Sequence, residues 1–567
     1  MTPGAPSNSG PAGGAGRRLL GQVLKGQGVV KEGQVQEALA EQRKHGGLIG
    51  QCLVQLGHAT TAQIARALAE QAGLEAVDLS RVVPEKAALA LVDASSAHAY
   101  GVLPLRMEGK TLVVAIADPL NTSVLEDLRF QKGIEVRAAL ADAAQIKARV
   151  LEHYGPEGTL ADAIRDAARA VSGGDVQSAA KSGPVVRLLN SILHRAIQDR
   201  ASDVHFEVFE GSLRIRYRVD GSLYEIEAPP AHLASPLIAR IKVLADLDIA
   251  ETRMPQDGRI ELAIDGRPVD LRVASIPGVS GEGCVLRVLD RSAVSLDLVA
   301  LGLEAVDREQ LTRLTRLPHG IVLVTGPTGS GKTTTLYAML QEANQPDLKI
   351  ITVEDPVEYD IEGVVQVPIH DDIGVTYASV LRTVLRQDPD KILIGEIRDG
   401  ETASVAVEAS LTGHTVFSTL HTNDAPSTVT RLVDMGVEPF LITATLEAVV
   451  AQRLVRTICD GCKERYEPDE DLIMELGPDA ELVRGKPFWF GKGCARCHHT
   501  GYRGRTGIFE ILHVGEEIRA AILRRASTGE IRAAAVRAGM RSLRDVGVQA
   551  MLAGKTTIEE VLRETAR

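Results

Sequence analysis

The sequence predicts a multidomain α/β protein with a phosphate-binding domain in its C-terminal half, and three observations lead to this fold class. The 567 residues are too many for one hydrophobic core, so a chain of this length is expected to form about three or four domains. Runs of β-branched residues alternate with helical patterns along most of the chain. The apolar run at 321–324 leads directly into a glycine-rich loop and then a helical segment, the order found at phosphate-binding sites.

The glycine-rich loop is the most specific motif in the chain. Residues 326–333 read GPTGSGKT and match G-x-x-x-x-G-K-[ST] at every position. Lys332 is expected to reach the β- and γ-phosphates of a nucleotide, and the Thr333 hydroxyl to help hold Mg²⁺. A glycine-rich turn without a ligand is the alternative, but the flanking strand and helix favour a nucleotide. The predicted nucleotide-binding residues are Gly326, Pro327, Thr328, Gly329, Ser330, Gly331, Lys332, Thr333 and Thr334.

The overall composition limits the class of protein. A hydrophobic content of 44% and a charged content of 24% are ordinary for a soluble globular protein. The aromatic content of 3% and the net charge of −12 disfavour a base-stacking platform or a broad contact with nucleic-acid phosphates. No apolar run reaches the length of about 18 residues that spans a bilayer, so no transmembrane helix is predicted. Residues 1–16 are small, polar and rich in Gly and Pro, which predicts a disordered tail.

Residues 17–72 contain a tandem repeat. Each unit is predicted to form a short helix, a glycine C-cap, a turn and a longer amphipathic helix. The frame resembles the MshEN-type domain, whose two motifs bind cyclic di-GMP. That family usually has arginine directly before the first leucine, where this chain has Leu19, so ligand binding and simple helix packing both stay open. The residues that repeat at a constant offset are Gly21 and Gly50, Gly28 and Gly57, and Gln42 and Gln71.

A change of pattern marks the next segment. Residues 73–155 are predicted to form a small α/β docking subdomain without a catalytic constellation. Residues 156–183 contain Ser172-Gly173-Gly174 and predict a mobile linker around one weak helix. The elements predicted in the subdomain are a strand running into a turn at 112–119, a helix at 124–130, a strand at 136–140 and a helix at 143–154.

Residues 184–300 are predicted to form an arginine-rich α/β domain. Arginine recurs at alternating positions of its strand patterns, which places several arginines on one face of a sheet. A solvated charged face is one interpretation. The other is that a second domain or subunit delivers a cation to a developing γ-phosphate charge, as phosphoryl transfer often requires. The candidates for that role are Arg259, Arg272 and Arg287.

Three strands that follow the phosphate loop end in polar residues. The strand at 350–353 runs into Glu354 to Glu358, the strand at 391–394 is followed by Gly395 and Glu396, and the strand at 415–420 lies between His414 and His421. Carboxylates at such strand ends can orient water or hold Mg²⁺ through water, and a histidine can donate to a γ-phosphate. The predicted catalytic residues are Glu354, Glu358, Glu396 and His421, with Glu354 and Glu396 both open as the group that activates water.

Four of the six cysteines form two C-x-x-C pairs, Cys459 with Cys462 and Cys494 with Cys497. Two such pairs predict a tetrahedral Cys₄ site for Zn²⁺, which leaves no open position for catalysis and is therefore structural. A redox dithiol is the alternative, but the thioredoxin-like βαβ context is lacking. The predicted zinc-binding insertion spans 457–508.

Taken together, these motifs resemble one family. The segments GPTGSGKTT, VEDPVE, RQDPDKILIGEIRD and GHTVFSTLHTNDA are similar to the GspE/PilB branch of the type II secretion and type IV pilus assembly ATPases, and RASDVHFE and RMPQDGR resemble the same family's preceding domain. The resemblance implies a RecA-like ATPase domain at 301–567, a PAS-like domain before it, and a hexamer that binds nucleotide between the two. It also implies that 326–333 is Walker A, 354–358 the aspartate box, Glu396 the Walker B acid and 414–421 the histidine box.

The resemblance implies a cytoplasmic ATPase, peripheral at the inner membrane, that drives pilus or pseudopilus assembly with ATP and Mg²⁺. Its partners would be identical subunits and inner-membrane platform and docking proteins, with no nucleic acid. The cysteine insertion favours an assembly motor over a retraction motor. A DNA-translocating or conjugation-type motor is the alternative, disfavoured by the acidic charge. A nucleotide-gated scaffold with cyclic di-GMP as its main ligand is a third hypothesis.

Overall fold

The computed structural model divides the chain into two compact units, Met1–Ala293 and Val294–Arg567, referred to below as the N-terminal and C-terminal units. The boundary lies shortly before residue 301, where the sequence predicts the nucleotide-binding domain to begin. The predicted disordered tail at 1–16 lies outside the described residues. The structure describes residues 19–566 except 46–47, 93, 120–124, 126–127, 130–132, 155–158, 172–175, 265–266 and 291–295.

The tandem repeat folds as four helices, in the predicted order of a short and a long helix in each unit. They are α1 (Leu20–Gly26), α2 (Glu32–His45), α3 (Ile49–Gln55) and α4 (Thr61–Ala72). A Cβ on Gly21 would lie 2.9 Å from Val35 Cγ1, and one on Gly50 would lie 2.9 Å from Ile64 Cγ2. Helix packing alone therefore explains these two equivalent glycines. Binding of cyclic di-GMP to the repeat stays a prediction.

The next subdomain is a four-stranded mixed sheet with helices, in the order β1-β4-β3-β2. Strands β3 and β4 are parallel, and β2 pairs with β3 in antiparallel fashion. The strands at 111–116 and 135–140 and the helix at 143–154 agree with the sequence, whereas the expected helix at 124–130 lies mostly outside the described residues. The elements are β1 (Glu75–Ala76), α5 (Lys86–Leu89), α6 (Ala94–Tyr100), β2 (Leu103–Glu108), β3 (Thr111–Ile116), β4 (Glu135–Leu140) and α8 (Ala143–Tyr154).

The segment 156–183, predicted as a mobile linker around one weak helix, contains two helices in its described part. Helix α9 (Leu160–Ala170) begins at a capping box, in which Thr159 and Asp162 bond each other's backbone, and α10 spans Val176–Ala180. Ile164 and Ala167 are buried in the same core as the following helix. Their apolar spacing is the sequence signal for a helix that packs against its neighbours.

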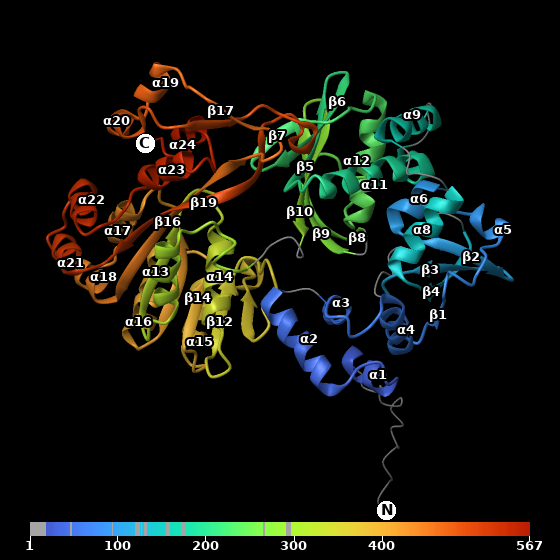
Figure 1. Ribbon diagram of the computed structural model, residues 1–567, viewed down its shortest axis with the longest axis horizontal. Helices are drawn as coiled ribbons and strands as arrows, with labels where there is room; N and C mark the ends of the chain where they lie inside the picture. Colours follow the sequence, from blue (N-terminus) through green and yellow to red (C-terminus); the bar gives the residue numbers. More distant parts are fainter. Residues whose placement is uncertain are drawn as a thin grey trace, which may run out of the picture. The chain divides into compact units, whose positions relative to one another are not determined.

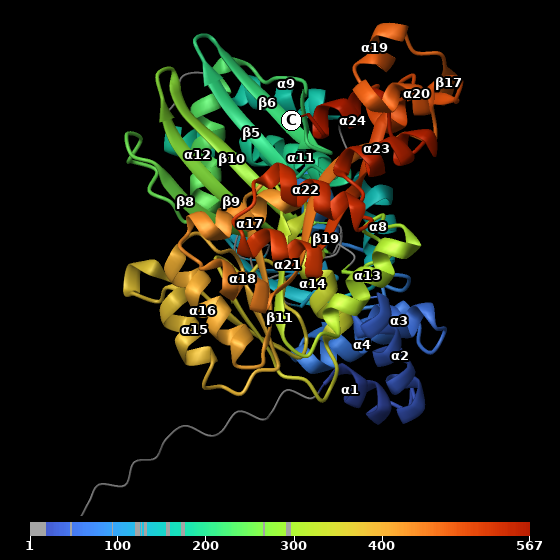
Figure 2. The same ribbon diagram turned by 90° about the vertical axis from the view of Figure 1, so that its left-hand side faces the viewer.

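The arginine-rich domain is a six-stranded antiparallel sheet, ordered β7-β6-β5-β10-β9-β8. Helices α11 and α12 cover one face, where Val204, Phe206 and Leu286 are fully buried (Figures 1 and 2). The elements are α11 (Gly183–Gln198), β5 (Asp203–Phe209), β6 (Ser212–Val219), β7 (Ser222–Glu225), α12 (Ala234–Leu244), β8 (Gln256–Ile264), β9 (Arg267–Gly278) and β10 (Gly281–Asp290).

The C-terminal unit is built on a seven-stranded sheet in the order β13-β12-β14-β15-β11-β16-β19. Every neighbouring pair is parallel except β16 and β19. The carboxyl ends of β11, β12, β14 and β15 therefore meet at one edge of the sheet, where ligands bind in such folds. The strands are β11 (Gly320–Thr325), β12 (Ile350–Glu354), β13 (Val364–Pro368), β14 (Lys391–Ile394), β15 (Thr415–Leu420), β16 (Leu446–Ile458) and β19 (Tyr502–His513).

Helices cover both faces of this sheet, and each face has its own apolar core. Among the described residues, no helix combines the length and the apolar character needed to cross a bilayer. The helices are α13 (Ala305–Thr315), α14 (Lys332–Ala343), α15 (Tyr377–Val384), α16 (Gly400–Leu411), α17 (Ala425–Asp434), α18 (Pro439–Thr445), α21 (Glu516–Leu523), α22 (Thr528–Arg537), α23 (Leu543–Leu552) and α24 (Ile558–Glu564).

The cysteine-containing insertion lies between β16 and β19, close to the predicted range of 457–508. It contains a two-stranded sheet of β17 (Lys463–Tyr466) and β18 (Phe488–Gly491) and two short helices, α19 (Glu470–Met474) and α20 (Ala480–Val483). Its apolar residues share a small core with α23 and α24 (Figure 1).

One buried ion pair joins the beginning and the end of the C-terminal unit. Arg541 donates to both carboxylate oxygens of Asp307 at 2.7 Å, and Asp307 is 5% exposed. Replacing Arg541 with Met leaves that carboxylate buried without its partner, so the free energy of unfolding is expected to fall by about 3 kcal/mol. Thermal and urea unfolding measure the loss.

The matched control is Arg313→Met on α13, because the Arg313–Glu309 pair is exposed on both sides. Its expected effect is about 0.5 kcal/mol or less. Equal unfolding midpoints for the two variants would contradict the assigned role of Arg541.

Candidate active site

The phosphate loop joins β11 to α14, as the sequence predicts. A Cβ on Gly326 would lie 2.6 Å from the Gln452 carbonyl oxygen, and one on Gly331 would lie 2.9 Å from Gln452 Nε2, so both positions need glycine. Gly331 is the N-cap of α14, and no side chain caps this helix end. The first N–H groups of α14 are therefore free of side-chain acceptors and can bind an anion.

Lys332 lies at the start of α14 with 9% of its surface exposed. Its Nζ donates to the carbonyl oxygens of Gly326 at 2.9 Å and Pro327 at 3.1 Å. Burial lowers the pKa of Lys332, while nearby Glu396 opposes that change. The lysine is thus held by weak neutral acceptors that phosphate oxygens can replace. Thr333 is exposed beside it.

Glu396 and His421 come together at the ends of β14 and β15. His421 Nε2 lies 3.0 Å from one carboxylate oxygen of Glu396, and Arg398 pairs with the other. Burial alone would raise the pKa of Glu396, but hydrogen bonds from Arg398 and His421 bring it below its usual value. Glu396 is therefore ionised at neutral pH. This carboxylate can accept a proton from water or contact Mg²⁺ through water.

Glu354 occupies the end of β12 but points into the protein. It is 3% exposed, and Tyr337 on α14 donates a short hydrogen bond to its carboxylate. Thr352 Oγ1 donates to Glu354 Oε1 at 2.5 Å, and Gln366 Nε2 donates to the same oxygen at 3.2 Å. Hydrogen bonds from these three neutral donors to the Glu354 carboxylate thus join α14, β12 and β13. Glu358 is half-buried in the next loop, where its backbone N–H donates to Tyr337.

The two histidines that flank β15 lie at opposite ends of the strand. His421 follows the carboxyl end, at the same edge as the phosphate loop. His414 precedes the strand, and its Nδ1 lies 2.9 Å from the Ala409 carbonyl oxygen at the end of α16. His414 therefore stabilises a helix terminus, and of the pair His421 is the one placed for chemistry.

The three candidate arginines of the N-terminal unit lie side by side. The strand register places Arg259 opposite Arg272, and Arg272 opposite Arg287. The row continues with Asp203, which is opposite Arg287, and ends at Arg218, which is opposite Asp203. The row lies on the sheet face opposite to α11 and α12. Arg287 Nε donates to Asp203 at 3.1 Å, but like charges directly opposite one another still destabilise a sheet. Such a row suits an anionic ligand.

The motifs in the sequence do not point to Gln452 and Arg453, which lie next to the phosphate loop. Thr335 donates to the buried Gln452 at 2.7 Å, and Arg453 follows it on β16. The available signal was the polar pair Gln452-Arg453 inside an otherwise apolar strand.

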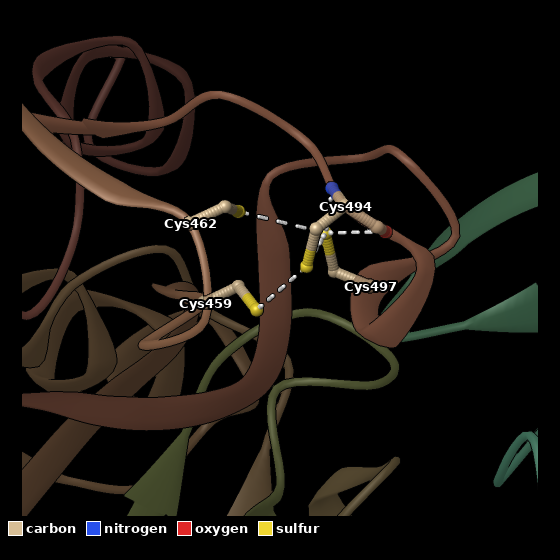
Figure 3. Close-up of side chains that lie close together, drawn as sticks. All are labelled: Cys459, Cys462, Cys494 and Cys497. Carbon is tan, nitrogen blue, oxygen red and sulfur yellow. Dashed lines mark hydrogen bonds between the residues drawn. The ribbon is translucent and has the colours of Figure 1, made fainter.

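The four predicted cysteines form one cluster (Figure 3). Their Sγ atoms lie within 4.8 Å of one another, with 3.9 Å between Cys459 and Cys494, 3.8 Å between Cys462 and Cys497, and 3.7 Å between Cys494 and Cys497. A tetrahedron of thiolates around Zn²⁺ has edges of about 3.8 Å. Backbone N–H groups of Gly493 and Cys494 point at two of the sulfurs, at 3.3 and 3.2 Å. The donor set fits Zn²⁺.

Comparisons with known proteins agree with these motifs. The family described as "Type II/IV secretion system protein" matches residues 178–563. The MshEN domain matches 72–160, which is the α/β subdomain and not the repeat at 17–72 where the sequence placed the likeness. The type IV pilus assembly ATPase PilB of Myxococcus xanthus (strain DK1622) is 41% identical over 96% of this chain and 99% of its own length.

Two further relatives are similar over much of the chain. The type II secretion system protein E of Dickeya dadantii (strain 3937) is 45% identical over 87% of this chain and 93% of its own length. A solved structure, the ATPase DotB of Legionella pneumophila, is 23% identical with a TM-score of 0.49, covering 66% of this chain and 94% of DotB.

The cysteine cluster yields a direct test. The purified protein is expected to contain about one zinc per chain, and the double variant Cys459→Ser/Cys494→Ser is expected to contain almost none, because two thiolates cannot hold a structural Zn²⁺. Metal content is measured by mass spectrometry.

Cys284→Ala is the control. Cys284 is a buried cysteine outside this cluster, so its substitution should leave the zinc content unchanged. Zinc retained by the double variant, or absent from the native protein, would contradict the assignment.

Proposed function

The chain belongs to the type II/IV secretion system protein family, and from this premise we propose that it is a cytoplasmic motor that couples ATP hydrolysis to assembly of a pilus or pseudopilus. The chain is an ATP-hydrolysing P-loop enzyme. The observation that carries the proposal is the meeting of Glu396 and His421 at the sheet edge that also bears the phosphate loop. That edge holds both a phosphate-binding group and an ionised carboxylate.

The chain's own residues suggest how hydrolysis proceeds. The N–H groups at the start of α14 bind the phosphates, and Lys332 exchanges its two carbonyl acceptors for phosphate oxygens. The Thr333 hydroxyl and the Glu396 carboxylate are oxygen donors of the kind that Mg²⁺ prefers, and the ion would offset phosphate charge. Glu396 orients the attacking water and accepts its proton, while His421 donates to the γ-phosphate. The inward hydrogen bonds of Glu354 support Glu396 for this role.

The arginine row is proposed to complete the site. A cation supplied by a second domain or subunit stabilises charge in the transition state of phosphoryl transfer. Arg259, Arg272 and Arg287 form a row of like charges that an anion would relieve, which supports this role. Binding of nucleotide between the second domain and the ATPase domain of a homo-hexamer follows from the proposal. The antiparallel sheet with helices on one face supports the PAS-like description of this domain.

The remaining features fit a motor that acts at a membrane through partners. The zinc-binding insertion and the N-terminal subdomain are proposed to contact inner-membrane platform and docking proteins. Zn²⁺ would hold the two cysteine pairs of the insertion together, and apolar residues of the insertion pack against α23 and α24, which supports a rigid surface there.

Substitution of the two glutamates separates their roles. Glu396→Gln is expected to lower kcat by about 10²- to 10⁴-fold with ADP affinity retained, because the base is lost and the phosphate loop is intact. Glu354→Gln is expected to lower kcat at least tenfold less, and to lower the unfolding temperature instead, because its partners are structural. Steady-state ATPase assays and calorimetry measure both.

Lys332→Ala provides the inactive control. A larger loss of kcat for Glu354→Gln than for Glu396→Gln would contradict the assignment. Absence of hydrolysis by the assembled native protein would remove the motor proposal, and strong stimulation by DNA would favour the conjugation-type motor.

The arginine row has its own control within the same sheet face. Arg272→Gln and Arg287→Gln are expected to lower kcat by about 10³-fold, the usual effect of removing a transition-state arginine. Arg214→Gln changes an arginine in another row, where it stacks on Phe209, and should leave kcat within about twofold. ATPase rates of the oligomer are measured at saturating ATP. Equal rates for all three variants would show that the row serves only as a solvated face.

A further inference from the structure

Arg453 is a buried cation that touches two loops of the active site. It lies on β16, directly beside β11, and only 9% of its surface is exposed. Its Nη2 donates to the Asn423 carbonyl oxygen at 2.9 Å and lies 3.4 Å from Asn423 Oδ1. Its Nη1 donates to the Gln452 carbonyl oxygen at 3.1 Å. Asn423 is two residues beyond His421, so Arg453 holds the end of the loop that carries the histidine.

The same guanidinium lies against the first glycine of the phosphate loop. A Cβ on Gly326 would be 3.2 Å from Arg453 Nη1 and 2.6 Å from the Gln452 carbonyl oxygen. The carbonyl oxygen of Gly326 is in turn one of the two acceptors of Lys332. Gly326 and the Arg453 guanidinium are therefore close neighbours, and a hydrogen bond joins Arg453 to Asn423.

The charge of Arg453 is unusual for a structural residue. Among the described residues, no carboxylate lies within ion-pair distance of its guanidinium. Burial lowers the pKa of Arg453, and Glu564, Asp424 and Glu510 oppose that change from beyond contact distance. A buried charge without a counter-ion destabilises a fold, and an apolar residue would suit this strand better. A cation here carries a stability cost that an apolar residue would avoid, and its position between the two loops points to a functional contribution.

A second link joins the same two segments. The hydroxyl of Thr325, the last residue of β11, accepts a hydrogen bond from the backbone N–H of Thr422 at 3.0 Å. The Thr422 hydroxyl lies 2.5 Å from Thr325 Oγ1 and 2.6 Å from Thr428 Oγ1 on α17. The hydroxyl contacts fix the start of the loop after β15, and Arg453 fixes its end.

We propose that Arg453 is a positioning residue that bridges the phosphate loop and the loop of His421, so that a nucleotide bound at Gly326–Thr333 sets the position of His421 against Glu396. The bridge requires the planar fork of arginine, which directs separate N–H groups to the carbonyls of Gln452 and Asn423. Lysine carries the same charge but no such fork. The inference rests on the ATPase activity of this site and deepens it.

The bridge predicts a separation of binding from hydrolysis. Among the described residues, no hydrogen bond joins Arg453 to Lys332 or to the N–H groups of the phosphate loop, so the groups expected to bind phosphate keep their own contacts when Arg453 changes and nucleotide affinity should change little. A misplaced catalytic group typically lowers the rate by about 10²-fold. Arg453→Lys and Arg453→Gln in the full chain are both expected to lower kcat by about 10²-fold, with the Kd of a fluorescent ADP analogue within about threefold of the native value.

Asn423→Ala is the matched control. It removes only the longer contact at 3.4 Å and leaves the Asn423 carbonyl in place, so its kcat should stay within about twofold of native. Hydrogen–deuterium exchange supplies a readout that a merely structural role would not move. A non-hydrolysable ATP analogue should slow exchange at 326–333 and at 421–424 in the native protein, but only at 326–333 in Arg453→Lys.

A native kcat for Arg453→Lys, or slowed exchange at both segments in that variant, would overturn the bridge. Thr422→Val provides an independent variant if Arg453 changes prevent folding, because it cuts the hydroxyl link near the surface. It should lower kcat about tenfold and weaken the slowing of exchange at 421–424, and unchanged values in both measurements would overturn the coupling. Failure of the proposed function has a different signature, namely a native protein that hydrolyses no ATP.

Discussion

Lys332 is a buried cation held by main-chain carbonyls, and the phosphate loop of the C-terminal unit is arranged around it. The described residues place no carboxylate within ion-pair distance, and burial lowers its pKa against the opposing effect of Glu396. The uncapped N-terminus of α14 adds positive potential at the same place. Phosphate oxygens can compensate both the charge of Lys332 and the positive potential at the N-terminus of α14. The parallel strands bring Glu396 and His421 to the same edge of the sheet.

A second group of positive charges lies in the arginine-rich domain of the N-terminal unit. Arg259, Arg272 and Arg287 are neighbours in one row, and Asp203, which lies in the row between Arg287 and Arg218, pairs with Arg287. A nucleotide polyphosphate is complementary both to a buried lysine at a helix N-terminus and to a row of arginines. The proposed ring, in which nucleotide binds between such sites, accounts for both. The cysteine cluster, by contrast, supplies rigidity and no open coordination position.

The features that the sequence predicted are those encoded by local patterns. The loop at 326–333 and the cysteine pairs follow from local motifs, and the positions of Glu396 and His421 follow from strands that end at one edge of a sheet. Other features depend on residues that are distant in the chain. The inward orientation of Glu354 depends on Tyr337 and Gln366, the arginine row depends on strand register, and the role of Arg453 depends on Asn423. One weak helix was predicted at 156–183, whereas the packing of α9 in the core of the arginine-rich domain depends on residues distant in the chain.

The central claim is that Glu396, His421 and an arginine of the row meet at one nucleotide. A cryo-electron microscopy structure of the assembled protein with Mg²⁺, ADP and aluminium fluoride tests it most directly. The account predicts that Lys332 Nζ leaves the Gly326 and Pro327 carbonyls for phosphate or fluoride, that Glu396 lies beside the in-line water, and that Arg259, Arg272 or Arg287 contacts the fluoride. Glu354 beside that water, or no arginine of the row at the nucleotide, would contradict it.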